Sequence, residues 1–100
     1  MVTSSYVPDN SADLIWLNFS PQAGSEQAGR RPAVVLSPAA YNSRSHLALV
    51  CPITNQQKGY PFEIVLPKGL AITGVILADH VRSLDWREGR AEKAEPSRDG

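Results

Sequence analysis

Residues 24–38 read Gly-Ser-Glu-Gln-Ala-Gly-Arg-Arg-Pro-Ala-Val-Val-Leu-Ser-Pro, a polar loop bracketed by glycines that runs directly into an apolar segment. The glycines allow the loop backbone conformations that other residues rarely adopt. Pro32 fixes its own φ and disfavours helical backbone at Arg31, which we therefore expect to be extended and held in place. The sequence thus predicts a loop with one acid and two arginines that leads into a β-strand over residues 31–37.

The composition is that of a folded globular chain of 100 residues, a length that fits one domain with a modest core. Hydrophobic residues make up 42% of the sequence, and acidic and basic residues are equal in number. A nucleic-acid ligand would therefore require basic side chains to gather on one face, since there is no basic excess. No apolar segment is long enough to cross a membrane, and the first ten residues lack the pattern of a signal peptide.

Cys51 is the single cysteine and cannot form an internal disulfide, so the cytoplasm is the expected compartment. It lies in an apolar run without a basic neighbour in sequence, which predicts a buried, unreactive thiol. No cluster of histidine and cysteine has the spacing of a metal site, and we expect no metal or other cofactor.

Segments rich in β-branched, aromatic and aliphatic residues recur between turn signals. They predict six short strands, over residues 13–19, 31–37, 47–53, 62–66, 74–78 and 81–86. A single helical turn is expected at residues 38–42, and Pro52 requires a sheet edge or a bulge in the third strand. Short strands with close turns predict a mainly β fold, a small antiparallel barrel or curled sheet.

The end of the chain has a different composition. Residues 88–100 contain no apolar side chain larger than alanine. We therefore expect a single barrel domain over residues 1–87, followed by a polar tail over residues 88–100 that has nothing to bury and is disordered.

Six short motifs occur in order: Tyr6-Val7-Pro8-Asp9, Asp13-Leu14-Ile15-Trp16, residues 24–29, residues 31–38, Lys58-Gly59-Tyr60-Pro61-Phe62-Glu63 and Ala78-Asp79. Together they resemble the MazF/PemK family, the toxins of bacterial type II toxin–antitoxin modules, from about residue 6 to residue 87. The resemblance implies an SH3-like antiparallel β-barrel of the MazF/CcdB kind that forms a homodimer. It also implies cleavage of single-stranded RNA without a metal, to give 2′,3′-cyclic phosphate and 5′-hydroxyl ends, and inhibition by a MazE-type antitoxin. The usual C-terminal helix has no counterpart in the sequence of residues 89–100.

The chemistry implied by this resemblance uses the 2′-hydroxyl of the substrate as the nucleophile. The protein must then position RNA, transfer protons and stabilise charge. Arg31 matches the catalytic arginine of the family, and a guanidinium can hold two phosphate oxygens at once. Thr54 matches the catalytic threonine and can donate a hydrogen bond to a phosphate oxygen. Glu26 can either accept the 2′-hydroxyl proton, if its pKa is raised, or organise the loop by pairing with an arginine.

Polar side chains near these residues are candidates for contacts with base edges and flanking phosphates, since readers of single-stranded RNA need hydrogen-bonding groups there. They are Gln27, Arg30, Asn55, Gln56 and Lys58. Lys58 also has a simpler interpretation as a solvated turn residue.

The aromatic residues Trp16, Phe19, Phe62 and Trp86 could stack on bases, but a core or interface role is favoured. The alternative function is a barrel that only binds. It would be a CcdB-like topoisomerase poison, or a toxin remnant that binds antitoxin without cleaving RNA.

Overall fold

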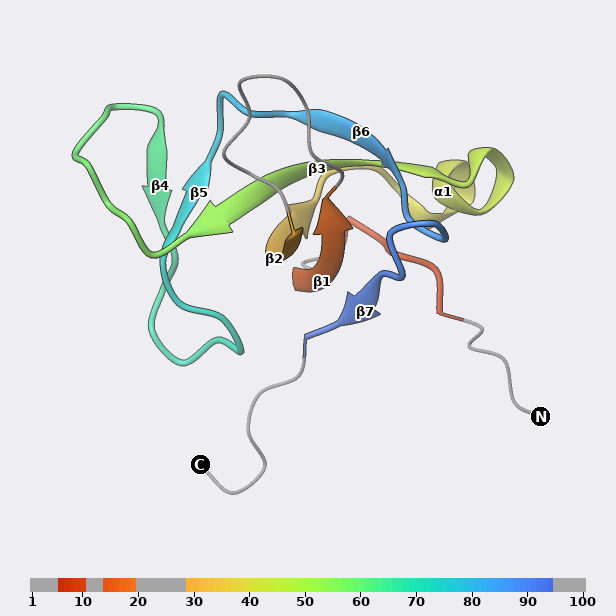
Figure 1. The fold of residues 1–100 in the computed structure, drawn as a ribbon, viewed down its shortest axis with the longest axis horizontal. Helices are drawn as coiled ribbons and strands as arrows, with labels where there is room; N and C mark the ends of the chain where they lie inside the picture. Colours follow the sequence, from red (N-terminus) through yellow and green to blue (C-terminus); the bar gives the residue numbers. More distant parts are fainter. Residues whose placement is uncertain (1–5, 11–13, 20–28, 95–100) are drawn as a thin grey trace.

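The computed structural model describes residues 6–10, 14–19 and 29–94, which form seven strands and one short helix (Figure 1). The elements are β1 (Leu14–Phe19), β2 (Gly29–Val35), α1 (Ala39–Ser45), β3 (Leu47–Thr54), β4 (Glu63–Val65), β5 (Val75–Leu77), β6 (Arg82–Asp85) and β7 (Glu92–Lys93). The predicted mainly β class is confirmed. All six predicted strands are present, and no end is shifted by more than two residues.

β3 is the central strand, and every pairing in the sheet is antiparallel. β2 pairs along one side of β3, while β6 and β5 pair in turn along its other side. β1 and β7 extend the sheet beyond β2, and β4 extends it beyond β5. In Figure 1, β3 crosses the molecule from α1 to the β4–β5 pair. The described strands thus form an open antiparallel sheet with β4 and β7 at the ends of its path.

Pro52 lies inside β3 at the point where the strand changes partners. β6 pairs with residues 47–50 of β3 and β5 pairs with residues 53–54, so neither strand is in register with Pro52 on that side. Its register partner is Ala33 of β2. The edge position that a proline requires is therefore supplied by a gap between β6 and β5.

The main core cluster lies on one face of β1, β2 and the first half of β3, and Cys51 and Ile53 are also buried on the other face of β3. Ile15, Leu17 and Phe19 of β1 are buried, whereas Trp16 and Asn18 between them are exposed. Successive side chains of a strand point to opposite faces, which explains this alternation. The core cluster consists of Ile15, Leu17, Phe19, Ala33, Val35, Ala48 and Val50. Phe19 and Trp86 have the structural role predicted for them, since Phe19 is buried and Trp86 packs against this cluster.

The helix α1 is longer than the predicted single turn and ends at His46, whose φ of 63° is left-handed. Its Asn42 is fully buried, and Ser37 Oγ donates a 2.6 Å hydrogen bond to Asn42 Oδ1. Asn42 Nδ2 donates to the Pro8 carbonyl at 2.7 Å, and the Asn42 carbonyl accepts from Trp86 Nε1 at 2.8 Å. These bonds satisfy a buried amide and join three distant parts of the chain. None of the helices formed by the described residues is long and apolar enough to span a bilayer.

Residues 88–94 differ from the disordered tail that the sequence suggested. β7 pairs with Ile15 and Trp16 of β1, and Ala91 packs against the core cluster. Gly89 is buried so close to Leu17 that a Cβ would collide with it. Small side chains and backbone hydrogen bonds order this segment. The lack of large apolar residues therefore did not mean that residues 88–94 are disordered. Residues 95–100 lie outside the described part of the chain.

Candidate active site

The first site feature is an open pocket of about 360 Å³ between β1, β2 and the end of β3, which we call the Arg31–Thr54 pocket. Its lining residues are Trp16, Arg31, Pro32, Ile53, Thr54, Asn55, Ala71, Ile72 and Thr73. Three of the residues predicted from the sequence, Arg31, Thr54 and Asn55, are therefore brought together in space.

Strand register explains why Arg31 and Thr54 meet. β2 and β3 are antiparallel, with Ala33 opposite Pro52. The same register, continued by two residues, sets Arg31 opposite Thr54, and residues two apart along a strand share one face. Arg31 itself lies in the β1–β2 ladder opposite Leu17, which gives it the extended backbone predicted from Pro32. The guanidinium is thus carried on a paired strand.

Two hydrogen bonds order the residues around Thr54. Thr54 Oγ1 accepts a 3.1 Å hydrogen bond from the Gln56 backbone N–H. Since a hydroxyl is both donor and acceptor, Thr54 can accept this bond and still donate its own proton to another acceptor, such as a phosphate oxygen. Asn55 Oδ1 accepts from Thr73 Oγ1 at 3.4 Å, which links the end of β3 to the segment before β5.

Gly74 allows the segment before β5 to pack closely against the end of β3. Its φ of +127° is one that side chains disfavour, and a Cβ at this position would collide with the Thr54 carbonyl oxygen. β5 begins directly after it and pairs Val75 with Thr54. Gly74 therefore sets how closely the segment before β5 approaches Thr54.

A second, smaller pocket of about 100 Å³ adjoins the first, because Thr54 lines both. Besides Thr54, it is lined by Gln56, Lys58, Tyr60, Phe62, Glu63, Leu77 and His80, and we call it the Tyr60–His80 pocket. Two further predicted contact residues, Gln56 and Lys58, lie here. The other residues of this pocket were not predicted as site residues.

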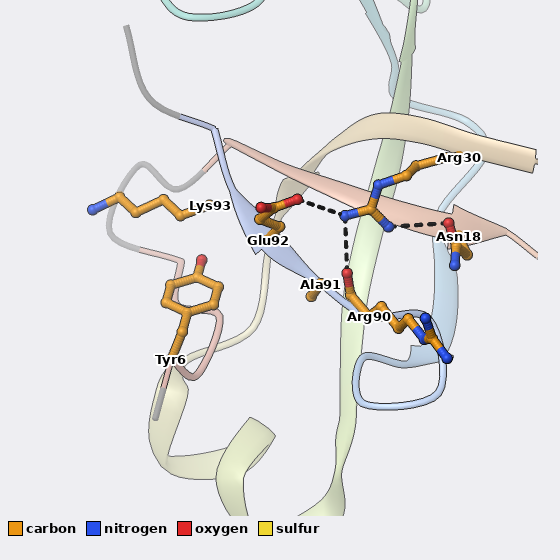
Figure 2. Close-up of a pocket in the computed structure, with 7 residues that line it drawn as sticks. All are labelled: Tyr6, Asn18, Arg30, Arg90, Ala91, Glu92 and Lys93. Atoms are coloured by element: carbon orange, nitrogen blue, oxygen red, sulfur yellow. Dashed lines mark hydrogen bonds and ion pairs between the residues drawn. The ribbon is translucent and has the colours of Figure 1, made fainter. Parts of the chain in front are cut away.

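Arg30 lies elsewhere, at a pocket of about 800 Å³ with Tyr6, Arg90 and Lys93 (Figure 2). Its guanidinium donates to Asn18 Oδ1 at 3.0 Å and to the Arg90 carbonyl at 3.1 Å. It also forms a 2.9 Å ion pair with Glu92. Arg30 is thus engaged with β1 and β7, whereas Arg31, its neighbour in sequence, lines the Arg31–Thr54 pocket.

Two of the predicted site residues, Glu26 and Gln27, lie outside the described part of the chain. Ala71, Ile72 and Thr73 were missed, because their segment was interpreted only as a connection between strands. The pair of glycines at positions 69 and 74 was the available signal that this connection is tightly folded. Among the described residues there is no group of three or more histidine, cysteine, aspartate or glutamate side chains that could hold a metal ion.

Cys51 has the buried environment that was predicted, with 3% of its surface exposed. Burial raises the pKa of its thiol, and the negative charge of Asp79 raises it further. A thiol that resists ionisation is a poor nucleophile, which sets Cys51 apart from the chemistry of the neighbouring pockets.

This chain is similar to known proteins over most of its length. The family of PemK-like, MazF-like toxins of type II toxin–antitoxin systems matches residues 10–96. The endoribonuclease toxin MazF of Escherichia coli K12 is 55% identical over 92 residues, which are 92% of this chain and 81% of that protein. The endoribonuclease PemK of Escherichia coli is 35% identical, over 81% of this chain and 65% of that protein.

Solved structures from Deinococcus radiodurans have the same fold. The crystal structure of MazF (Form-I) has a TM-score of 0.85 and 60% identity, covering 93% of this chain and 84% of that chain. The crystal structure of MazE-MazF (Form-II) has a TM-score of 0.78 and 61% identity, covering 95% of this chain and 86% of that chain.

Proposed function

The chain belongs to the family of PemK-like, MazF-like toxins of type II toxin–antitoxin systems, and from this premise we propose that it is an endoribonuclease toxin. Its substrate is single-stranded RNA, and its products carry 2′,3′-cyclic phosphate and 5′-hydroxyl ends. The observation that supports the proposal best is the Arg31–Thr54 pocket, where an arginine on a paired strand and a hydroxyl line the same pocket.

The proposed mechanism is an intramolecular displacement at phosphorus that needs no metal ion. The 2′-oxygen of the RNA loses its proton and forms a bond to phosphorus while the bond to the 5′-oxygen of the next nucleotide breaks, and that 5′-oxygen takes up a proton from solvent water to become the 5′-hydroxyl. Arg31 and Thr54 donate hydrogen bonds to the non-bridging oxygens, where negative charge accumulates. Glu26 accepts the 2′-hydroxyl proton, or else orients the loop through an arginine.

Substrate contacts in this proposal extend from Thr54 in both directions. Asn55 lies in the Arg31–Thr54 pocket, and Gln56 and Lys58 lie in the Tyr60–His80 pocket. We assign them, with Gln27, to base edges and flanking phosphates. Arg30 is bonded to β1 and β7. It can contact RNA either from this position or after leaving those partners.

The assembly that we propose follows the family. A MazE-type antitoxin binds and inhibits the toxin, as the presence of MazE with MazF in the similar complex suggests. The active toxin is a homodimer that acts in the cytoplasm, where its RNA substrate is found.

Incubation with a panel of single-stranded RNAs in excess EDTA tests this function. We expect cleavage at a short sequence, with 5′-hydroxyl ends that accept phosphate from a polynucleotide kinase. Removal of one charge-stabilising donor typically costs 10²- to 10³-fold in rate, so Arg31→Ala and Thr54→Val should each lose about that factor. Arg44→Ala, in the exposed last turn of α1, is the matched control and should cleave normally.

Three results would overturn the proposal: intact RNA with the unmodified protein, products with 3′-hydroxyl ends, or full activity of Arg31→Ala. Circular dichroism of each variant separates loss of chemistry from loss of the fold. Inhibition of a topoisomerase without RNA cleavage would instead support the alternative function of a barrel that only binds.

A further inference from the structure

We propose that His46 and Arg87 form a pH-sensitive latch, which holds the turn between β6 and β7 against the end of α1 and opens when the imidazole of His46 gains a proton. We call this pair the His46–Arg87 latch. It is independent of the proposed ribonuclease function, because neither residue lines the two pockets that share Thr54.

The contact between the two side chains requires one protonation state of the imidazole. Arg87 Nη1 lies 3.2 Å from His46 Nε2, within hydrogen-bond distance. A guanidinium has donors only, so Nε2 is the acceptor and the single ring proton lies on Nδ1. A proton added at Nε2 removes this acceptor and places two positive charges side by side. The hydrogen bond therefore exists only while His46 is neutral.

His46 is held in place on the α1 side of the latch. It caps the C-terminal end of α1 with a left-handed backbone, and its N–H donates to the Asn42 carbonyl at 2.9 Å. Its own carbonyl accepts from the Trp86 N–H at 3.2 Å, and its ring meets the Trp86 indole edge to face, with centroids 6.4 Å apart. Trp86 in turn packs against the core cluster. Because His46 is anchored, we expect the loss of the hydrogen bond to move Arg87.

The turn that carries Arg87 leads to β1 through hydrogen bonds. Asp85 Oδ1 accepts from the N–H groups of Arg87 and Glu88, each at 2.9 Å. The Gly89 N–H donates to the Asp85 carbonyl at 2.9 Å, and the Gly89 carbonyl accepts from the Asn18 N–H of β1 at 2.8 Å. A displacement of Arg87 is therefore expected to weaken the protection of the Gly89 and Asn18 amides.

Other charges near the imidazole act in both directions. Arg44, in the last turn of α1, opposes a second positive charge as Arg87 does. The carbonyl end of α1 and the carboxylates of Asp85 and Glu88 favour one. The direction of the switch does not depend on this balance, because only the neutral imidazole accepts from Arg87. The contact stabilises the turn at high pH and is lost as pH falls through the titration of His46.

An NMR titration from pH 8 to pH 5 tests the latch, since this is the range in which imidazoles change charge. The carbon-bound ring protons of His46 report its protonation. As it proceeds, the Gly89 and Asn18 amides should exchange about 2- to 10-fold faster relative to the intrinsic rate at each pH, the factor expected for one lost hydrogen bond. The amides of β3 should keep their protection.

Two variants remove the switch in different ways. His46→Asn has no titrating group, and asparagine tolerates a left-handed backbone. Arg87→Gln can donate to a neutral imidazole and accept from a protonated one, so it should keep the turn closed at every pH. In both variants the pH response of Gly89 should disappear. His80→Gln, which removes the other histidine of the chain, is the matched control and should respond as the wild type does.

Four results would overturn the proposal. The response of Gly89 could persist in His46→Asn or in Arg87→Gln. His46 could become protonated without any change in the turn amides, or gain no proton down to pH 5. The amides of β3 could lose protection together with Gly89, which would indicate global unfolding. None of these measurements uses RNA, so failure of the latch and failure of the ribonuclease function are separate results.

Discussion

Arg30 and Arg31 are neighbours of the same residue type, yet they lie in different environments. The two side chains are adjacent in β2, and side chains of adjacent strand residues point to opposite faces. Arg30 is therefore directed to Asn18 and Glu92, whereas Arg31 lines the pocket with Thr54. A sequence motif with two arginines cannot assign these different environments, but the strand alternation does.

Cys51 gives a prediction about pH at the same scale. Burial raises the pKa of its thiol, so the native state favours the protonated form more strongly than the unfolded state does. This contribution to stability is complete below the pKa of an unfolded thiol, roughly 8.5, and is lost as pH rises through the native pKa. The free energy of unfolding in urea should therefore fall between pH 8 and pH 10, by at most about 1.4 kcal/mol per pH unit.

Cys51→Ala is the control, because all other titrating groups are retained. The wild type should lose more stability than this variant over the same pH range. Parallel pH profiles for the two proteins would show that ionisation of Cys51 does not contribute.

At the scale of elements, Gly74 links the geometry of β5 to the position of Thr54. Gly74→Ala should place a Cβ against the Thr54 carbonyl oxygen and displace the end of β3. We expect a loss of about 1–3 kcal/mol in unfolding free energy, because the backbone is both strained and crowded, together with a clear drop in the rate of RNA cleavage. Urea unfolding and cleavage kinetics measure the two effects.

Gly69→Ala separates strain from crowding. Gly69 also has a positive φ, of +92°, but a Cβ there would meet nothing within 4 Å. It should lose about 1 kcal/mol of stability and retain cleavage. Equal cleavage rates for the two variants would mean that Gly74 does not position Thr54.

The strands were predictable because their signals are local. Alternation in residues 14–19 and apolar runs in residues 47–53 depend on the chain near each position. β7 was not predictable in this way, since it is held by pairing with β1 and by the small residues Gly89 and Ala91 against the core. Pairing of distant backbone segments leaves little trace in the composition of a two-residue strand.

At the scale of the whole molecule, the site was only partly predictable for the same reason. The chemistry of Arg31 and Thr54 was suggested by residue type and resemblance, and the β2–β3 register explains their meeting. The Tyr60–His80 pocket combines residues from the turn before β4, from β5 and from the segment after it. The sequence alone does not specify which side chains from such distant turns will share a pocket.

The contacts of Arg30 connect the start of β2 to the end of the described chain, and this gives a final prediction for the whole fold. Its guanidinium joins β1, the carbonyls before β7, and Glu92 on β7 (Figure 2). Because Glu92 is 74% exposed, Glu92→Gln should cost less than about 1 kcal/mol. Arg30→Ala should cost about 1–2 kcal/mol, since the Asn18 side chain and the carbonyls also lose their donor.

Hydrogen exchange shows whether this loss is local to β7. The Ala94 N–H donates to the Leu14 carbonyl and the Asn18 N–H donates to the Gly89 carbonyl, both at 2.8 Å. Both amides should exchange faster in Arg30→Ala, and the amides of β3 should not, because β7 would detach without unfolding the core. If Arg30 serves RNA instead, Arg30→Ala will raise KM while both amides keep their wild-type exchange rates. That outcome would show that Arg30 is a substrate contact and does not hold β7 in place.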